Sequence, residues 1–139
     1  MAEETGATDI HRGLKGVYFD RSKVCDIDGR AGELRYRGYS IHDLAPNSTF
    51  EETCYLLLKG ELPSRAQLEA FDEELKASRR LPDEIIRIIE TVQHAHPMDV
   101  LRTAVSALAT FDPEVADNSA AATLRKGIRL TSQVPMIVA

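Results

Sequence analysis

Apolar residues recur at helical spacing through most of the chain, and most regularly over residues 97–111. The residues that form this stripe are Val100, Ala104, Ala107, Leu108 and Phe111, and Leu101 and Val105 widen it. Steps of three and four place such residues on one side of an α-helix. A helix that is apolar over most of its surface is typical of a buried position. We therefore expect a helix over 97–111 that acts as a central packing element.

The start of this helix is marked by a His-Pro step. The residue before a proline favours an extended backbone, so His96 is expected to lie outside the helix. Pro97 suits the first helical position, where its missing N–H costs nothing. Asp99 then places a carboxylate near the positive end of the helix dipole.

Four further helices are predicted upstream by capping signals and terminators. A short turn over 39–45 should end at Pro46, and a capping box over 48–51 should open a helix that ends at Gly60. A second capping box covers 64–67. Pro82 marks the start of the next helix.

The last predicted helix covers 118–139 and is capped by Ser119. Thr123, Gly127 and Thr131 form a row of small residues along it. Glycine inside a helix costs about 1 kcal/mol relative to alanine, so its presence suggests a close helix–helix contact. Neither a capping glycine nor a basic last turn closes this helix, and we expect the sequence to be cut within a longer one.

The N-terminal part follows a different pattern. Residues 1–12 are polar and are expected to form a loose leader. Two short β-prone runs, 23–27 and 33–36, flank a glycine-containing loop and predict a small β-hairpin. The expected fold is therefore mainly α, with one small N-terminal hairpin and a single unit over 13–139.

Composition narrows the class of protein. The 139 residues are 43% hydrophobic and 28% charged, as in globular domains, and the net charge of -5 argues against a nucleic-acid partner. We found no apolar run of membrane-spanning length and no signal-peptide core, so the expected location is cytoplasmic, without a membrane partner. Two isolated cysteines, Cys25 and Cys54, are expected to stay reduced.

The nearest approach to a reactive cluster is formed by His94, His96 and Asp99. Two histidines and a carboxylate can bind a metal, but a fourth ligand is missing from their surroundings in the sequence. A loop followed by a helix cap explains the same residues. We expect neither a metal site nor a catalytic site here.

Several stretches, in this order, resemble the citrate synthases of the shorter bacterial and archaeal type. The stretches are 13–17, the hairpin and turn over 27–41, the helix and terminator over 50–63, and, most specifically, His96-Pro97-Met98-Asp99-Val100-Leu101-Arg102-Thr103-Ala104-Val105-Ser106-Ala107-Leu108. Together they cover nearly the whole chain. The closely related 2-methylcitrate synthases share these stretches, so the resemblance leaves acetyl-CoA and propionyl-CoA both open as co-substrates.

The resemblance implies an almost all-helical homodimeric enzyme with a large and a small domain. Residues 13–139 would be the N-terminal part of the large domain. The helices over 97–111 and 118–139 would belong to a helical sandwich between subunits. The family reaction condenses oxaloacetate with acetyl-CoA, using an aspartate base and two histidines, while arginines hold the carboxylates.

The family's catalytic histidines, aspartate and substrate arginines lie in the later two-thirds of the polypeptide. No position in 1–139 matches those motifs. We therefore expect no catalytic residue and no bound cofactor in this chain, and we expect inactivity for the chain alone. His94 and His96 match the family's structural His-Pro-Met-Asp helix start, not its catalytic histidines.

The candidate functional surface is a subunit interface. The residues expected near it are Ala104, Leu108, Leu124, Gly127 and Ile128. The expected partners are a second copy and the remaining C-terminal part of the enzyme. Two alternatives stay open at this point: a natural short protein that uses this module for dimerisation without catalysis, and an unrelated helical binding module.

Overall fold

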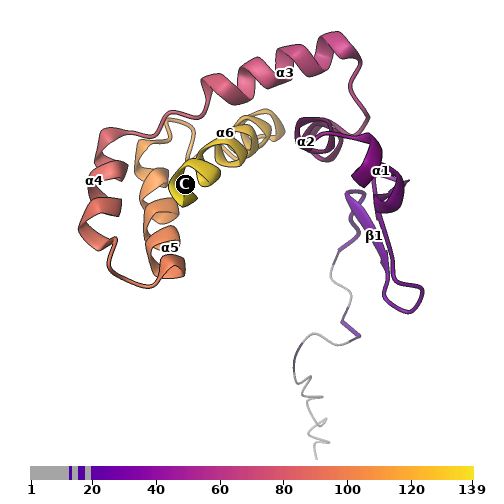
Figure 1. Ribbon diagram of the computed structural model, residues 1–139, viewed down its shortest axis with the longest axis horizontal. Helices are drawn as coiled ribbons and strands as arrows, with labels where there is room; N and C mark the ends of the chain where they lie inside the picture. Colours follow the sequence, from indigo (N-terminus) through magenta and orange to yellow (C-terminus); the bar gives the residue numbers. More distant parts are fainter. Residues whose placement is uncertain (1–12, 14–15, 18–19) are drawn as a thin grey trace, which may run out of the picture.

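The computed structural model describes residues 13, 16–17 and 20–139, and the expected leader over 1–12 lies outside them. Within that part the protein is mainly α-helical, with six α-helices and one small antiparallel sheet (Figure 1). The predicted fold class is confirmed. The helices are α1 (Ile41–Asn47), α2 (Phe50–Lys59), α3 (Arg65–Ala77), α4 (Asp83–Val92), α5 (Pro97–Leu108) and α6 (Ala120–Val138).

The predicted hairpin is the larger part of a three-stranded sheet. Strands β1 (Cys25–Asp28) and β2 (Glu33–Tyr36) pair antiparallel, and β3 (Tyr39–Ser40) adds to the far side of β2. The turn between β2 and β3 has positive φ at both Arg37 (49°) and Gly38 (93°). Two residues with positive φ make the tight turn whose twist suits a two-residue hairpin. Strand β3 was not predicted, because the sequence pattern placed Tyr39 and Ser40 in the following helical turn.

The helix starts follow the predicted capping logic, with one shift. Ser64 and Gln67 form the expected capping box of α3. The box of α2 is formed by Thr49 and Glu52, one residue later than predicted. Adjacent hydroxyl residues at 48 and 49 make both registers possible in sequence, and the Glu52 carboxylate accepts the Thr49 N–H at 2.7 Å. Gly60 ends α2 in a left-handed conformation, as expected.

The prediction that Pro46 ends the first helix was wrong, because Pro46 lies inside the last turn of α1. Carbonyls of that turn find partners further on: Ser48 N–H bonds to Leu44 O at 2.8 Å, and the Asn47 side-chain amide bonds to Asp43 O at 2.9 Å. A short helix closed in this way tolerates a proline near its end.

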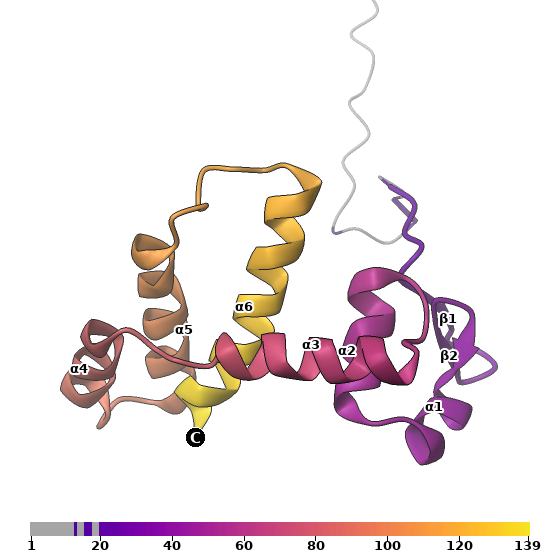
Figure 2. The same cartoon turned by 90° about the horizontal axis from the view of Figure 1, so that it is seen from above.

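The helices form two hydrophobic clusters. The first joins α2, α3 and α6 through Tyr55, Phe71, Leu75 and Ile128, with the two aromatic rings edge to face at 5.3 Å. The second joins α4, α5 and α6 through Ile85, Ala104, Leu108 and Ile137. Helix α6 lies between α5 and α2 and contributes to both clusters, through Ile128 and Ile137 (Figure 2).

Candidate subunit interface

Helix α5 begins as its sequence predicts. The Nδ1 atom of His96 accepts a hydrogen bond from Met98 N–H at 3.2 Å, so the imidazole is the N-cap. One turn in, Arg102 donates to the Asp99 carboxylate at 2.9 Å. His96 therefore has a structural role at the helix start, and this role matches the expectation from the His-Pro step.

The composition of α5 predicted a helix that is buried over most of its surface. In the structure, α5 is buried over only part of it. Ala104 and Leu108 are buried against α4 and α6, whereas Arg102, Thr103 and Ser106 are exposed. The difference arises because, among the described residues, α4 and α6 flank α5 but leave part of its surface uncovered (Figure 1). This open side of α5 carries Arg102, Thr103 and Ser106 and faces solvent.

The five residues expected near a subunit contact all pack within the chain. Ala104 and Leu108 belong to the α4–α5–α6 cluster. Leu124 and Ile128 pack in the α2–α3–α6 cluster. A Cβ at Gly127 would meet the end of the Leu58 side chain at 3.4 Å, so this glycine permits α6 to approach α2. A subunit contact near these residues stays a prediction. It would involve the exposed residues beside them, because the five residues themselves pack within the chain.

The open side of α5 carries small residues, and two of their hydroxyls already have hydrogen-bond partners. A shallow hollow there is lined by Arg102, Thr103, Ser106, Ala107 and Thr110. Thr103 Oγ1 donates to Asp99 O at 2.7 Å, and Thr110 Oγ1 donates to Ala107 O at 2.8 Å. Burying a hydroxyl that already has a hydrogen bond within its own helix costs less free energy than burying an unpaired one. This side of α5 is therefore suited to close packing against another helix.

Helix α6 has a comparable open stripe. Its members recur at steps of three and four, namely Thr123, Gly127, Leu130, Val134 and Val138. Leu130 is 43% exposed and Val138 is 68% exposed. Small residues lie toward the start of the stripe and apolar ones toward its end. Gly127 and Val134 of the stripe are half-buried, and Gly127 faces Leu58 of α2. The exposed residues are Thr123, Leu130 and Val138 on α6, next to the exposed side of α5.

An ion-pair network holds the segment between α5 and α6 against α6. Arg129 Nη2 donates to both carboxylate oxygens of Asp112 at 2.8 and 2.9 Å, and its Nη1 donates to Glu114 Oε2 at 2.8 Å. Arg125 Nε lies 2.9 Å from Glu114 Oε1, and its Nη2 donates to the same oxygen. Lys126 Nζ donates to Asp117 O at 2.6 Å.

These contacts lower the pKa values of the acidic side chains in this loop. Hydrogen bonds from Arg125 and Arg129 lower the pKa of Glu114 from 4.5 to about 2. The Arg129 hydrogen bond likewise lowers the pKa of Asp112. The pKa of Asp117 is lowered by a hydrogen bond from the backbone N–H of Ser119, the residue whose hydroxyl caps the following helix. All three acids are thus held in their charged form by groups that also fix the loop.

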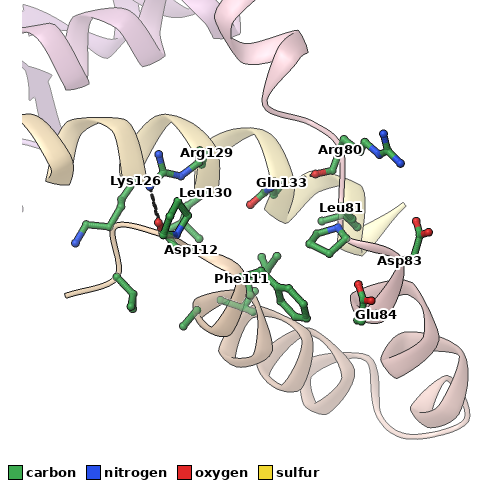
Figure 3. A pocket seen from close by; sticks show the side chains of 16 residues that line it. Arg80, Leu81, Asp83, Glu84, Phe111, Asp112, Lys126, Arg129, Leu130 and Gln133 are labelled. Atoms are coloured by element: carbon green, nitrogen blue, oxygen red, sulfur yellow. Dashed lines mark hydrogen bonds and ion pairs between the residues drawn. The ribbon is translucent and has the colours of Figure 1, made fainter. Parts of the chain in front are cut away.

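A groove of about 600 Å³ lies where the start of α4, the end of α5 and the middle of α6 meet (Figure 3). Its walls include the apolar side chains of Leu81, Phe111, Val115 and Leu130. The charged residues that line it balance, with Arg80, Lys126 and Arg129 against Asp83, Glu84 and Asp112. The groove therefore has an apolar floor and no excess charge that would attract an ion.

Neither the ion-pair network nor the groove is predicted by the sequence. Asp112 and Arg129 are 17 residues apart, and no local pattern reports such a contact. One weak signal existed: Arg125 and Arg129 are four apart and share one side of α6. The groove depends on how three helices pack, which periodicity does not specify.

Metal and membrane signals are also missing from the part of the chain that the structure describes. His, Cys, Asp and Glu side chains form no group of three that could hold a metal ion. No described helix combines the length and the apolar character needed to cross a bilayer.

Comparison with known proteins gives a consistent result. The family model described as citrate synthase, C-terminal domain, matches residues 13–139. The chain is 41% identical over 133 residues to 2-methylcitrate synthase 2 of Corynebacterium glutamicum and to the citrate synthase of Deinococcus radiodurans. Each alignment covers 95% of this chain but 35% of the relative. The chain thus spans about a third of the length of these relatives.

Solved structures agree with this assignment. Citrate synthase from Pyrobaculum aerophilum matches with a TM-score of 0.82 at 33% identity, covering 89% of this chain and 33% of that one. Citrate synthase from Thermoplasma acidophilum, solved as a ternary complex with carboxymethyl coenzyme A and oxaloacetate, matches with a TM-score of 0.81 at 25% identity. That alignment covers 93% of this chain and 36% of that one. The chain belongs to the citrate synthase family.

Proposed function

We propose that this chain is the N-terminal part of an enzyme that condenses an acyl-CoA with oxaloacetate, and that it supplies helical scaffold and subunit contacts but no catalytic group. The observation that carries the proposal is the family match over 13–139, combined with a span of only about a third of the relatives. The condensing activity belongs to the complete enzyme. The short chain contributes one side of a dimer.

The charges of the described residues support a non-catalytic role. Binding a dicarboxylate requires arginines that are free to form bidentate contacts. The two arginines of α6, Arg125 and Arg129, already form ion pairs with Glu114 and Asp112. Generating an enol also requires a base beside hydrogen-bond donors, because losing one such donor typically costs about two to three powers of ten in rate. His96, the histidine beside α5, accepts its helix-capping bond instead.

The open surfaces of α5 and α6 support a role in association. The surfaces are the small-residue side of α5 around Thr103 and Ser106 and the α6 stripe that includes Leu130 and Val134. Stable interfaces need a well-packed, largely apolar centre. We infer a homodimer in which the α5 and α6 helices of two copies pack together. The contact would lie on the outer surface of these helices, whose inner sides bury Ala104 and Ile128.

Both acyl-CoA substrates fit the relatives, because citrate synthases and 2-methylcitrate synthases match this chain at similar identity. We propose acetyl-CoA as the co-substrate of the complete enzyme. Propionyl-CoA is the alternative.

A thiol-release assay tests the non-catalytic part of the proposal. The purified 139-residue chain, with its intact mass verified, is incubated with oxaloacetate and either acetyl-CoA or propionyl-CoA. Free CoA is followed with a colorimetric thiol reagent, and a complete citrate synthase from one of the relatives serves as the positive control. We expect no release above the blank. Turnover by the pure chain would show that its own residues catalyse the reaction.

A further inference from the structure

Arg37 joins three separate segments of the chain. Its backbone N–H donates to Val24 O at 2.9 Å, which ties the turn after β2 to the segment before β1. Its Nη2 donates to Leu57 O at 2.9 Å, in the last turn of α2, and its Nη1 lies 3.4 Å from Lys23 O. The last carbonyls of a helix have no partner within the helix and carry its negative dipole end. A guanidinium is therefore well matched to this position.

The backbone at Arg37 is unfavourable for a residue with a side chain. Its φ is 49°, whereas the other positive-φ residues among the described positions are all glycines. A left-handed conformation disfavours every residue with a Cβ. Its Nε is buried and has no hydrogen-bond partner among the described residues. The hydrogen bonds of its Nη1 and Nη2 atoms are therefore the polar contacts that hold this guanidinium in place.

The segment that Arg37 holds is otherwise weakly attached. Both hydrophobic clusters are built from α2–α6, and neither includes a residue of the sheet or of α1. Strand β1 is exposed along its whole length, and Leu44 is the one buried residue among 20–47. Where this segment faces the start of α2, an open groove of about 300 Å³ remains, lined by residues that include Tyr36, Leu44 and Phe50.

Hydrogen bonds between this segment and the helices are equally sparse. Across residues 20–139, the bond from Arg37 to Leu57 is the single hydrogen bond that links residues 20–47 to helices α2–α6. We propose that Arg37 is a latch, and that the sheet with α1 opens as one unit from the α2–α6 helices when this bond breaks. Weakly packed segments of a protein open locally at a lower free-energy cost than the whole fold.

Hydrogen–deuterium exchange on the full 139-residue chain tests the latch. Three variants are compared with the parent: Arg37→Ala, Arg37→Gly and Arg35→Ala. Arg37→Gly removes the guanidinium while relieving the left-handed backbone, so it separates the latch from backbone strain. Arg35→Ala is the matched control, because Arg35 is an exposed arginine of β2 whose side chain bonds only to Glu33.

We expect both Arg37 variants to speed exchange of the amides in 24–47 roughly tenfold, as loss of a hydrogen bond from a charged donor implies. Amides of α3–α6 should change less than about twofold, and Arg35→Ala should match the parent. The proposal is overturned if Arg37→Gly exchanges like the parent in 24–47. It is also overturned if exchange rises equally in α3–α6, or if amides of β1 and β2 are already unprotected in the parent.

Discussion

Arg129 Nη2 bonds to both carboxylate oxygens of Asp112, at 2.8 and 2.9 Å, and so fixes the segment that leaves α5 onto the middle of α6. The two residues are 17 apart in sequence and both are half-buried. The contact sets the separation of α5 and α6 at the wall of the groove. Weakening this ion pair is therefore expected to loosen the attachment of the segment after α5 to α6.

Replacing Arg129 with methionine keeps most of the side-chain volume and removes the charge. We expect the free energy of unfolding to fall by about 1 kcal/mol, since partly exposed ion pairs contribute up to that amount. Chemical denaturation followed by circular dichroism measures it. Arg102→Met is the control, because Arg102 is more exposed and pairs only with Asp99 within its own helix, so its loss should be smaller.

Acid should destabilise the fold through the same network. Glu114 has a pKa of about 2 in the folded protein against its ordinary 4.5, and the pKa of Asp112 is also lowered. As the pH falls below 4.5, the unfolded chain binds protons before the folded one does, so folding loses stability. The contribution of Glu114 is complete above pH 4.5 and lost as the pH approaches 2.

Thermal unfolding recorded between pH 2 and pH 6 tests this dependence. The melting temperature of the parent should fall as the pH is lowered through this range. Glu114→Gln should melt at a lower temperature than the parent at pH 6 and depend less steeply on acid. Parallel curves for the two proteins would show that Glu114 has an ordinary pKa.

Two adjacent isoleucines of α4 offer a matched test of the core. Ile85 is fully buried in the α4–α5–α6 cluster, whereas Ile86 is 44% exposed. Ile85→Ala should lower the free energy of unfolding by about 2 to 5 kcal/mol, because it leaves a cavity. Ile86→Ala should cost much less. Urea denaturation of both variants separates them, and equal losses would mean that α4 does not pack in this register.

His96→Ala tests the proposed role of His96 as the N-cap of α5. Losing the N-cap acceptor should reduce the free energy of unfolding by about 0.5 to 2 kcal/mol. His94→Ala is the control, since its side chain is exposed and surface substitutions usually change stability by less than about 0.5 kcal/mol. Thermal melts of the two variants provide the comparison. A larger effect at His94 would contradict the capping role of His96.

The elements of this fold were largely predictable because their signals are local. The capping box at Ser64 and Gln67, the His96-Pro97 start and the terminator at Gly60 each act within four residues, and the structure confirms each of them. The errors arose where two local signals competed. Thr49 rather than Ser48 caps α2, and Tyr39 joins the sheet rather than α1.

The candidate site was less predictable because it depends on contacts between distant segments. Periodicity identified Ala104 and Ile128 as apolar positions on their helices, but it did not show that both are covered by the chain's own helices. Which side of α5 stays open follows from where α4 and α6 pack. The Arg129–Asp112 contact and the Arg37–Leu57 contact, 17 and 20 residues apart, have no sequence periodicity at all.

The most direct test of the central claim, that α5 and α6 form the association surface, is the molar mass in solution. Multi-angle light scattering is recorded on the parent chain, on Ser106→Arg at the open side of α5, and on Ala77→Arg at an exposed position of α3. We predict a dimer or larger assembly for the parent and for Ala77→Arg, and a monomer for Ser106→Arg with an unchanged helical spectrum. A parent chain that stays monomeric at high concentration, or a Ser106→Arg variant that still assembles, would contradict the claim.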